Sequence, residues 1–244
     1  MKVKKIILFI FWLAIFVGVI FVAVRAGSTC DKMACEKYVI HIKVDDAADT
    51  LLYPFDIEKL VLKDSIIGRP YNEIDIYSIE DSLKRNLYVS EANIFGDMSG
   101  TLHIMAIQRT PVVRIINKYN ESFYLDKTAH AMPVRLGISA NVITVSGNID
   151  TTHNDWSALL SCVKYISNDT FLKNQIGQIY VNNANSYWLI PVIGNHKIVF
   201  GTPENPEKRL KRLKVFYQQG MTEEGWMNYK IIDLRYDNQI VCKR

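Results

Sequence analysis

The stretch Gln108-Arg109-Thr110-Pro111-Val112-Val113-Arg114-Ile115 divides the chain into two regions with different patterns. Before Pro111, alternating β-branched residues and two amphipathic stripes predict the order β-α-α-β-β. After Pro111, short strands and turns predominate, with fewer helices between them. The sequence therefore predicts an α+β fold, with a small first domain over 37–110 and a mixed β domain with flanking helices over 111–244.

Turn signals bound the elements of the first domain. A helix follows Pro54, and the loop Gly96-Asp97-Met98-Ser99-Gly100 joins two strands. We expect strands over 38–44, 92–95 and 101–108, and a second helix over 76–86.

The second domain is expected to contain two helices and a longer series of strands. One helix begins at Asn205-Pro206 and ends at Gly220, because these residues favour a helix start and a helix end. Its basic residues predict either a solvated face or a patch for an anionic partner; they are Lys208, Arg209, Lys211, Arg212 and Lys214. The other predicted elements are a helix over 156–166 and strands over 112–117, 123–125, 142–145, 178–181, 187–192 and 197–200.

The last predicted strand covers 229–241, with a bend at Asp237-Asn238. Only Cys242, Lys243 and Arg244 follow it, so we expect one edge of this strand to lack a neighbouring strand. Such an edge can accept an added strand from a binding partner. In the alternative interpretation, Ile232, Leu234 and Tyr236 simply face the core.

An uncharged apolar run from Ile6 to Val24 precedes both domains. A helix of that length spans roughly 28 Å, close to the hydrocarbon thickness of a bilayer. Three lysines precede the run and Arg25 follows it, which favours a cytoplasmic N-terminus. We therefore expect a cytoplasmic tip and single-pass anchor over 1–25, followed by a linker over 26–36. A cleaved signal peptide is the alternative, although its apolar core is usually shorter.

Charge gives no reason to expect a nucleic-acid partner. The chain has 29 Lys and Arg residues against 25 Asp and Glu residues. Four of the basic residues belong to the anchor segment, which has no acidic residue, so the remainder is balanced at 25 against 25. Binding to nucleic acid needs a basic surface.

Two of the four cysteines, Cys30 and Cys35, lie close together after the anchor. In an oxidising compartment they are candidates for a disulfide that closes a small loop. A zinc site is the competing interpretation, but no second Cys or His pair has ligand spacing. We predict no metal site.

Motifs of catalysis are missing from the sequence. It has no Gly-x-Ser-x-Gly nucleophile elbow, no phosphate-binding loop and no His-Glu-x-x-His pair. The five histidines are scattered. We therefore expect a protein that is not an enzyme and that has no cofactor and no small-molecule substrate. A membrane-anchored envelope enzyme with a site assembled in space remains the alternative.

Several short motifs resemble the bacterial cell-division family of FtsQ and DivIB, in the order and spacing of that family. Gln108-Arg109-Thr110-Pro111 is similar to the junction that closes the POTRA domain of the family and opens its β domain. The other motifs are Ile79-Glu80-x-x-Leu83, Tyr88-Val89-x-x-Ala92, Tyr124-Leu125-Asp126, Ala131-Met132-Pro133 and Asp233-Leu234-Arg235-Tyr236. Ala129 stands where the family has a glycine, so we expect a looser turn there. The Cys30 and Cys35 pair resembles Bacteroidetes-type members.

The resemblance implies a scaffold of the divisome in the bacterial inner membrane, with its bulk in the periplasm at the division septum. It implies a POTRA-like first domain, and bitopic partners that are FtsB-like (DivIC-like in some lineages) and FtsL-like. A POTRA-type assembly factor is a further alternative, although such proteins usually carry several POTRA units or a barrel.

By the same resemblance, the partner-binding residues are Asp233, Arg235, Tyr236, Asn238 and Gln239. Arg235 is expected to pair with a partner carboxylate, and Tyr236 is expected to cover an apolar partner residue. Gln239 stands near a glycine of the family.

Overall fold

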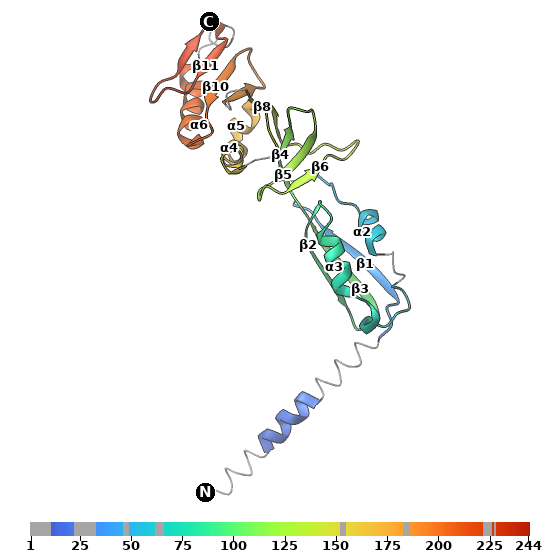
Figure 1. The fold of residues 1–244 in the computed structure, drawn as a ribbon. Coiled ribbons are helices and arrows are strands. Elements are labelled where there is room, and N and C mark those ends of the chain that lie inside the picture. The colour runs from blue at the N-terminus through green and yellow to red at the C-terminus, as the bar shows by residue number, and fades with distance from the viewer. Residues whose placement is uncertain are drawn as a thin grey trace, which may run out of the picture. The chain divides into compact units, whose positions relative to one another are not determined.

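Alternating apolar and polar residues build a three-stranded sheet in the first region of the chain (Figure 1). Its strands lie in the order β1-β3-β2, with β1 parallel to β3 and β2 antiparallel to β3. The elements are β1 (Lys37–Lys43), α2 (Pro54–Val61), the short turn η2 (Tyr71–Glu73), α3 (Ile76–Lys84), β2 (Val89–Gly96) and β3 (Thr101–Gln108). The predicted order β-α-α-β-β is confirmed, with η2 as an addition.

The computed structural model describes residues 11–21, 33–45, 49–61, 66–151, 155–182, 186–221, 226 and 228–244. Contacts divide the chain into two units. The first unit is Met1–Lys43 with Leu52–Gln108, and the second is Val44–Leu51 with Arg109–Arg244.

The first unit has its core on one face of the sheet. The apolar stripes of α2 and α3 supply Ile57, Val61, Ile79 and Leu83, and all four are buried. They pack in one cluster with inward-facing strand residues such as Ile94 and Ile104. Burial of such side chains stabilises the unit by about 2 kcal/mol each.

The second unit holds a nine-stranded sheet in the order β12-β11-β10-β9-β8-β7-β4-β5-β6. In Figure 1 its helices α4, α5 and α6 lie together, and they contact one another. The elements are β4 (Pro111–Ile116), β5 (Ser122–Asp126), β6 (Ala131–Pro133), β7 (Ile143–Gly147), α4 (Ser157–Asn168), α5 (Thr170–Gln175), β8 (Ile176–Val181), β9 (Tyr187–Pro191), β10 (Lys197–Gly201), α6 (Pro206–Val215), η3 (Phe216–Gly220), β11 (Ile231–Asp233) and β12 (Val241–Lys243).

The predicted strand over 229–241 is wrong. The structure has two short strands, β11 and β12, that form an antiparallel pair. The chain reverses at Asn238, whose φ of 59° lies in the left-handed region that asparagine tolerates. As a result, β11 lies between β10 and β12, and β12 is the edge strand of the sheet.

A short early segment, Val44–Leu51, belongs to the second unit, although it lies inside the range 37–110 predicted for the first domain. The Asn141 amide donates a hydrogen bond to the Asp49 carboxylate at 2.7 Å. The Arg135 guanidinium donates to the Leu51 carbonyl at 2.8 Å. The chain therefore passes between the two units at 43–44, at 51–52 and at 108–109.

The predicted anchor is described only in part. Residues 11–21 are helical and their side chains are exposed. In the described part of the chain, no helix combines the length and apolarity that a membrane crossing needs. Residues 6–10 and 22–24 of the predicted run lie outside the described residues.

Candidate partner-binding site

The loop between β11 and β12 brings most of the predicted partner-binding residues to the surface. Residues 235–239 are all exposed, and Tyr236 has 47% of its surface accessible. Ile232 and Leu234, by contrast, are buried in the core of the second unit. The alternation therefore ends at Leu234, and Tyr236 does not face the core as the alternative interpretation required.

Asp233 is buried at the end of β11 and holds Arg235 in place. Arg235 donates from Nε at 3.0 Å and from Nη2 at 2.6 Å to the two oxygens of this carboxylate. The hydrogen bond from the Arg235 side chain is the main reason why the pKa of Asp233 lies below its usual value, although burial acts in the opposite direction. The accessible fraction is 3% for the Asp233 side chain and 53% for that of Arg235. Asp233 therefore positions the loop from below, and Arg235 lies at the surface.

Helix α6 holds the start of the same loop. The Arg212 guanidinium donates to the Leu234 carbonyl at 2.7 Å. Gly201 at the end of β10 has a φ of +87°, and a Cβ atom there would lie 3.0 Å from Cγ of Arg235. Any other residue would be strained at this left-handed position, and its Cβ atom would press on the Arg235 side chain. Neither contact is visible in the local sequence pattern.

Most of the basic side chains of α6 contact other groups of the second unit, so they are not all available to an anionic partner. Arg209 donates to the Thr202 carbonyl at 2.6 Å, and Lys214 pairs with Asp169 at 2.6 Å. Lys208 lies 3.8 Å from Asp237 in the β11–β12 loop. These contacts favour the interpretation of a solvated helix face.

At the opposite edge of the sheet, two of the family-like motifs meet. Arg109 of the junction donates from Nη1 to Oδ2 of Asp126 at 2.5 Å. The accessible fractions of these side chains are 15% and 6%. Burial alone would raise the pKa of Asp126, but the hydrogen bonds from Arg109, Thr128 and His130 outweigh it and hold the pKa below its usual value. This pair has a structural role.

The Asp126 carboxylate also organises the turn between β5 and β6. Its Oδ1 accepts hydrogen bonds from the Thr128 amide at 2.8 Å, the Thr128 hydroxyl at 2.7 Å and the His130 amide at 2.8 Å. Ala129 has a φ of 65° in this turn. Ala129 therefore adopts a conformation that favours glycine, but the turn is held by these three hydrogen bonds and is not looser as expected.

The predicted disulfide stays a prediction. Cys30 lies outside the described residues. Cys35 is a buried free thiol in the core of the first unit, and it lies 3.5 Å from the Lys37 carbonyl oxygen.

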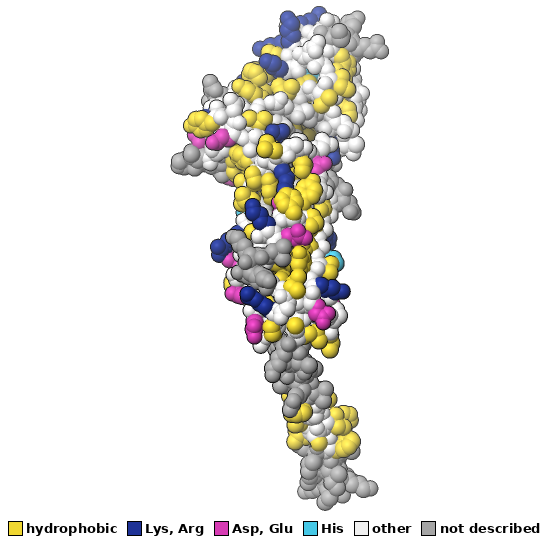
Figure 2. All heavy atoms as spheres, turned by 90° about the vertical axis from the view of Figure 1, so that its right-hand side faces the viewer, with side chains coloured by type: hydrophobic (Ala, Val, Ile, Leu, Met, Phe, Trp, Pro, Cys, Tyr) yellow, Lys and Arg dark blue, Asp and Glu magenta, His cyan; other side chains and the backbone are white. Residues whose placement is uncertain are grey.

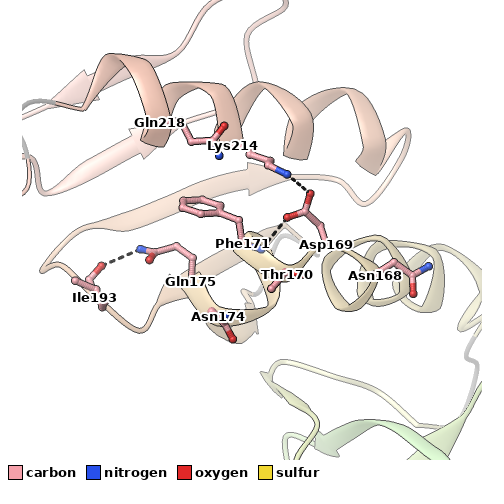
Figure 3. Close-up of a pocket in the computed structure, with 9 residues that line it drawn as sticks. All are labelled: Asn168, Asp169, Thr170, Phe171, Asn174, Gln175, Ile193, Lys214 and Gln218. Atoms are coloured by element: carbon pink, nitrogen blue, oxygen red, sulfur yellow. Dashed lines mark hydrogen bonds and ion pairs between the residues drawn. The ribbon is translucent and has the colours of Figure 1, made fainter. Parts of the chain in front are cut away.

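Among the described residues of the second unit, the side chains that line one pocket have structural roles. One pocket of about 630 Å³ lies between α5 and η3, where Gln218 lies across from Asn174 and Gln175 (Figure 3). Its polar groups serve local structure: Gln175 donates to the Ile193 carbonyl at 3.1 Å, and Asp169 accepts from the Phe171 amide at 3.0 Å. No three His, Cys, Asp or Glu side chains within the described ranges could hold a metal ion.

Charges are mixed on the face that Figure 2 shows. Over the first unit, lysine and arginine side chains alternate with acidic and hydrophobic ones there. This face therefore has no continuous basic surface of the kind that nucleic acid needs.

Comparison with known proteins places both units. A POTRA-like domain profile matches residues 33–107, and the profile described as FtsQ/DivIB, C-terminal related, matches residues 110–243. The chain is also similar to the cell division protein FtsQ of Rhodothermus marinus, with 27% identity over 201 residues that cover 78% of this chain and 72% of that protein. The second profile covers more than half of the chain, and two of the family-like motifs contact each other at Arg109 and Asp126. We conclude that the chain belongs to the FtsQ/DivIB family of cell-division proteins.

Proposed function

We propose that this cell-division protein is a non-enzymatic scaffold of the divisome, held in the bacterial inner membrane by the run Ile6–Val24. In this proposal, the two units lie in the periplasm at the division septum. They bind bitopic partners that are FtsB-like or DivIC-like and FtsL-like. Membership of the family supports the role in division. The apolar run and the lysines before it support the anchor and its orientation.

The observation that carries the proposal is the combination of an edge strand and an exposed loop. Among the described strands, β12 is hydrogen-bonded to β11 alone and lies at the edge of the nine-stranded sheet. The exposed residues 235–239 precede it in the chain, with the half-buried Ile240 between them and β12. A partner segment that adds to β12 would gain main-chain hydrogen bonds from the edge and side-chain contacts from the loop.

The structure changes how the predicted residues act in this proposal. Asp233 is buried beneath the loop and positions Arg235, so it does not touch the partner. A guanidinium group has five N–H donors, and Asp233 occupies Nε and Nη2. Nη1 of Arg235 therefore remains for a partner carboxylate. Tyr236, Asn238 and Gln239 supply exposed side-chain surface.

The test is photo-crosslinking from position 236 of the full chain in growing cells, followed by mass spectrometry of the captured protein. We expect capture of a small bitopic division protein. Tyr119 is the matched control, because it is an exposed tyrosine of the second unit in the turn between β4 and β5. Equal capture from both positions, or none from 236 in a folded chain, would contradict the proposed site.

A further inference from the structure

The sheet of the first unit has an outer face on which exposed side chains, together with the half-buried His103 and Ile107, form ordered rows. We call this the outer face; it consists of Val39, His41, Lys43, Glu91, Asn93, Phe95, His103, Met105 and Ile107. The strand register places Val39 beside His103 and His103 beside Phe95. The next row is His41, Met105 and Asn93, and the third is Lys43, Ile107 and Glu91.

The first row of the outer face is apolar and aromatic, and His41 and Met105 of the second row adjoin it. Phe95 stacks on His103 with 5.1 Å between ring centroids, and His103 stacks on His41 with 5.6 Å. Val39, Phe95 and Met105 are exposed. A run of exposed apolar side chains on a flat sheet face is typical of an interaction surface.

The β1 side of the outer face is complementary in charge and polarity to its β2 side. We propose that the outer face binds the outer face of a second copy of this chain, about a two-fold axis parallel to β3. Such an axis places β1 of one copy opposite β2 of the other, as in an isologous interface. Lys43 then faces Glu91 of the second copy, Val39 faces Phe95, and Met105 lies near the axis. Packed sheets cross at about 30°, an offset that the long Lys and Glu side chains can span.

The direction of the strands suits two anchored chains. Because the axis is parallel to the strands, both copies of β1 begin at the same end of the interface. The chain segments before Lys37 therefore leave on the same side, as two anchors in one membrane require. This step rests on the anchor of the proposed function.

The size of the outer face predicts weak association. Three strands of about seven residues cover roughly 14 Å by 23 Å. That area is well below the roughly 800 Å² per partner of a standard stable interface. Tethering in a membrane raises the effective concentration of the second copy. We therefore expect association in the membrane and not in dilute solution.

The test uses the full chain in bacterial membranes, with two differently tagged copies and a short bis-maleimide crosslinker. Met105→Cys is expected to give a crosslinked product that carries both tags. Tyr77→Cys is the matched control, because Tyr77 is exposed on α3 and not on the outer face. A product from Met105→Cys no stronger than that from Tyr77→Cys, with the chain in the membrane fraction, would overturn the proposal. So would a product that contains another protein in place of the second tag.

Charge reversal tests the predicted pairing of the rows. In the Met105→Cys background, Lys43→Glu or Glu91→Lys alone should lower the yield of the product about fivefold, since each change places like charges opposite each other twice. The double variant should restore it. Failure of this rescue would overturn the two-fold arrangement. A chain missing from the membrane fraction would contradict the anchor, and with it tethered association. Tyr236→Ala should leave the product unchanged, which separates this interface from the partner-binding site.

Discussion

The two edges of the nine-stranded sheet use the same side-chain chemistry for different purposes. The hairpin β5–β6 and the hairpin β11–β12 each contain an aspartate that binds an arginine, and each reverses through a left-handed residue that is not glycine. At the first edge, both members of the Arg109–Asp126 pair are largely buried. At the second, only Asp233 is buried and Arg235 is exposed.

This difference shows how the Arg109–Asp126 pair can stabilise the fold while the Arg235–Asp233 pair leaves its arginine accessible to a binding partner. The Asp126 carboxylate accepts hydrogen bonds from Arg109 and from its own turn, so the β5–β6 edge is stabilised by contacts within the unit. Asp233 binds Arg235 from below and leaves one side of the guanidinium to solvent. The first edge should therefore respond to mutation in stability, and the second in binding.

The largest expected effect is at the buried pair. Arg109→Ala should lower the free energy of unfolding by about 3 kcal/mol, because it leaves the Asp126 carboxylate buried without its charged partner. Arg235→Ala also removes the charged partner of a buried carboxylate, but the exposed arginine covers Asp233, so water can replace it there and the cost should be smaller, about 1 kcal/mol. Urea denaturation of the purified variants measures both. Similar losses would show that the two edges do not differ in this way.

The second effect concerns partner binding. Tyr236→Ala should weaken binding of the bitopic partner by about 2 kcal/mol, as expected for a large side chain at the centre of an interface. Tyr119→Ala serves as the control and should leave the dissociation constant unchanged. An unaltered dissociation constant for a folded Tyr236→Ala chain would place the interface elsewhere.

The two left-handed turn residues give a smaller effect. Ala129→Gly should raise the free energy of unfolding by about 1 kcal/mol, because alanine is strained at a φ of 65°. Asn238→Gly should change it by only a few tenths of a kcal/mol, because asparagine tolerates this region. Thermal unfolding of the two variants tests the order, and a larger gain at Asn238 would refute it.

The smallest effect is a dependence on pH. The pKa values of Asp126 and Asp233 lie below the ordinary value of about 3.9 in the folded protein. Their stabilising contribution is therefore complete above that pH and is lost as the pH falls through the folded pKa values. Denaturation between pH 6 and pH 2 should show the loss. Arg235→Gln should reduce it, since Arg235 is the main cause of the shift at Asp233, and an identical pH profile would contradict that cause.

Local pattern predicts the first unit well. The predicted strand over 101–108 coincides with β3, because its alternation faces a single core. The same reasoning fails at 229–241, where alternation from Ile232 to Leu234 reports burial but not the reversal that follows. The start of the loop that contains this reversal is held by two contacts remote in sequence, the hydrogen bond from Arg212 to the Leu234 carbonyl and the approach of Arg235 to Gly201.

The candidate site shows the same division. A short motif predicts Arg235 and Tyr236 as surface residues of a binding site, and both are exposed in the structure. The roles of Asp233 and Arg109 could not be predicted in the same way, because each depends on a tertiary contact and on the burial of a carboxylate. Residue type indicates which groups can pair, whereas the fold decides which pairs are removed from solvent.

The chain passes three times between the two units, and this limits where recombination between related genes can join two sequences without loss of contacts. The contiguous family matches at 33–107 and 110–243 suggest two parts that a single genetic exchange near residue 109 would separate. Yet 44–51 belongs to the second unit, where Asp49 and Leu51 accept hydrogen bonds from Asn141 and Arg135. A chimaera joined at residue 109 would combine one ancestor's acceptors with another ancestor's donors. Recombination should therefore favour exchange of the two units together, and the two units should evolve together.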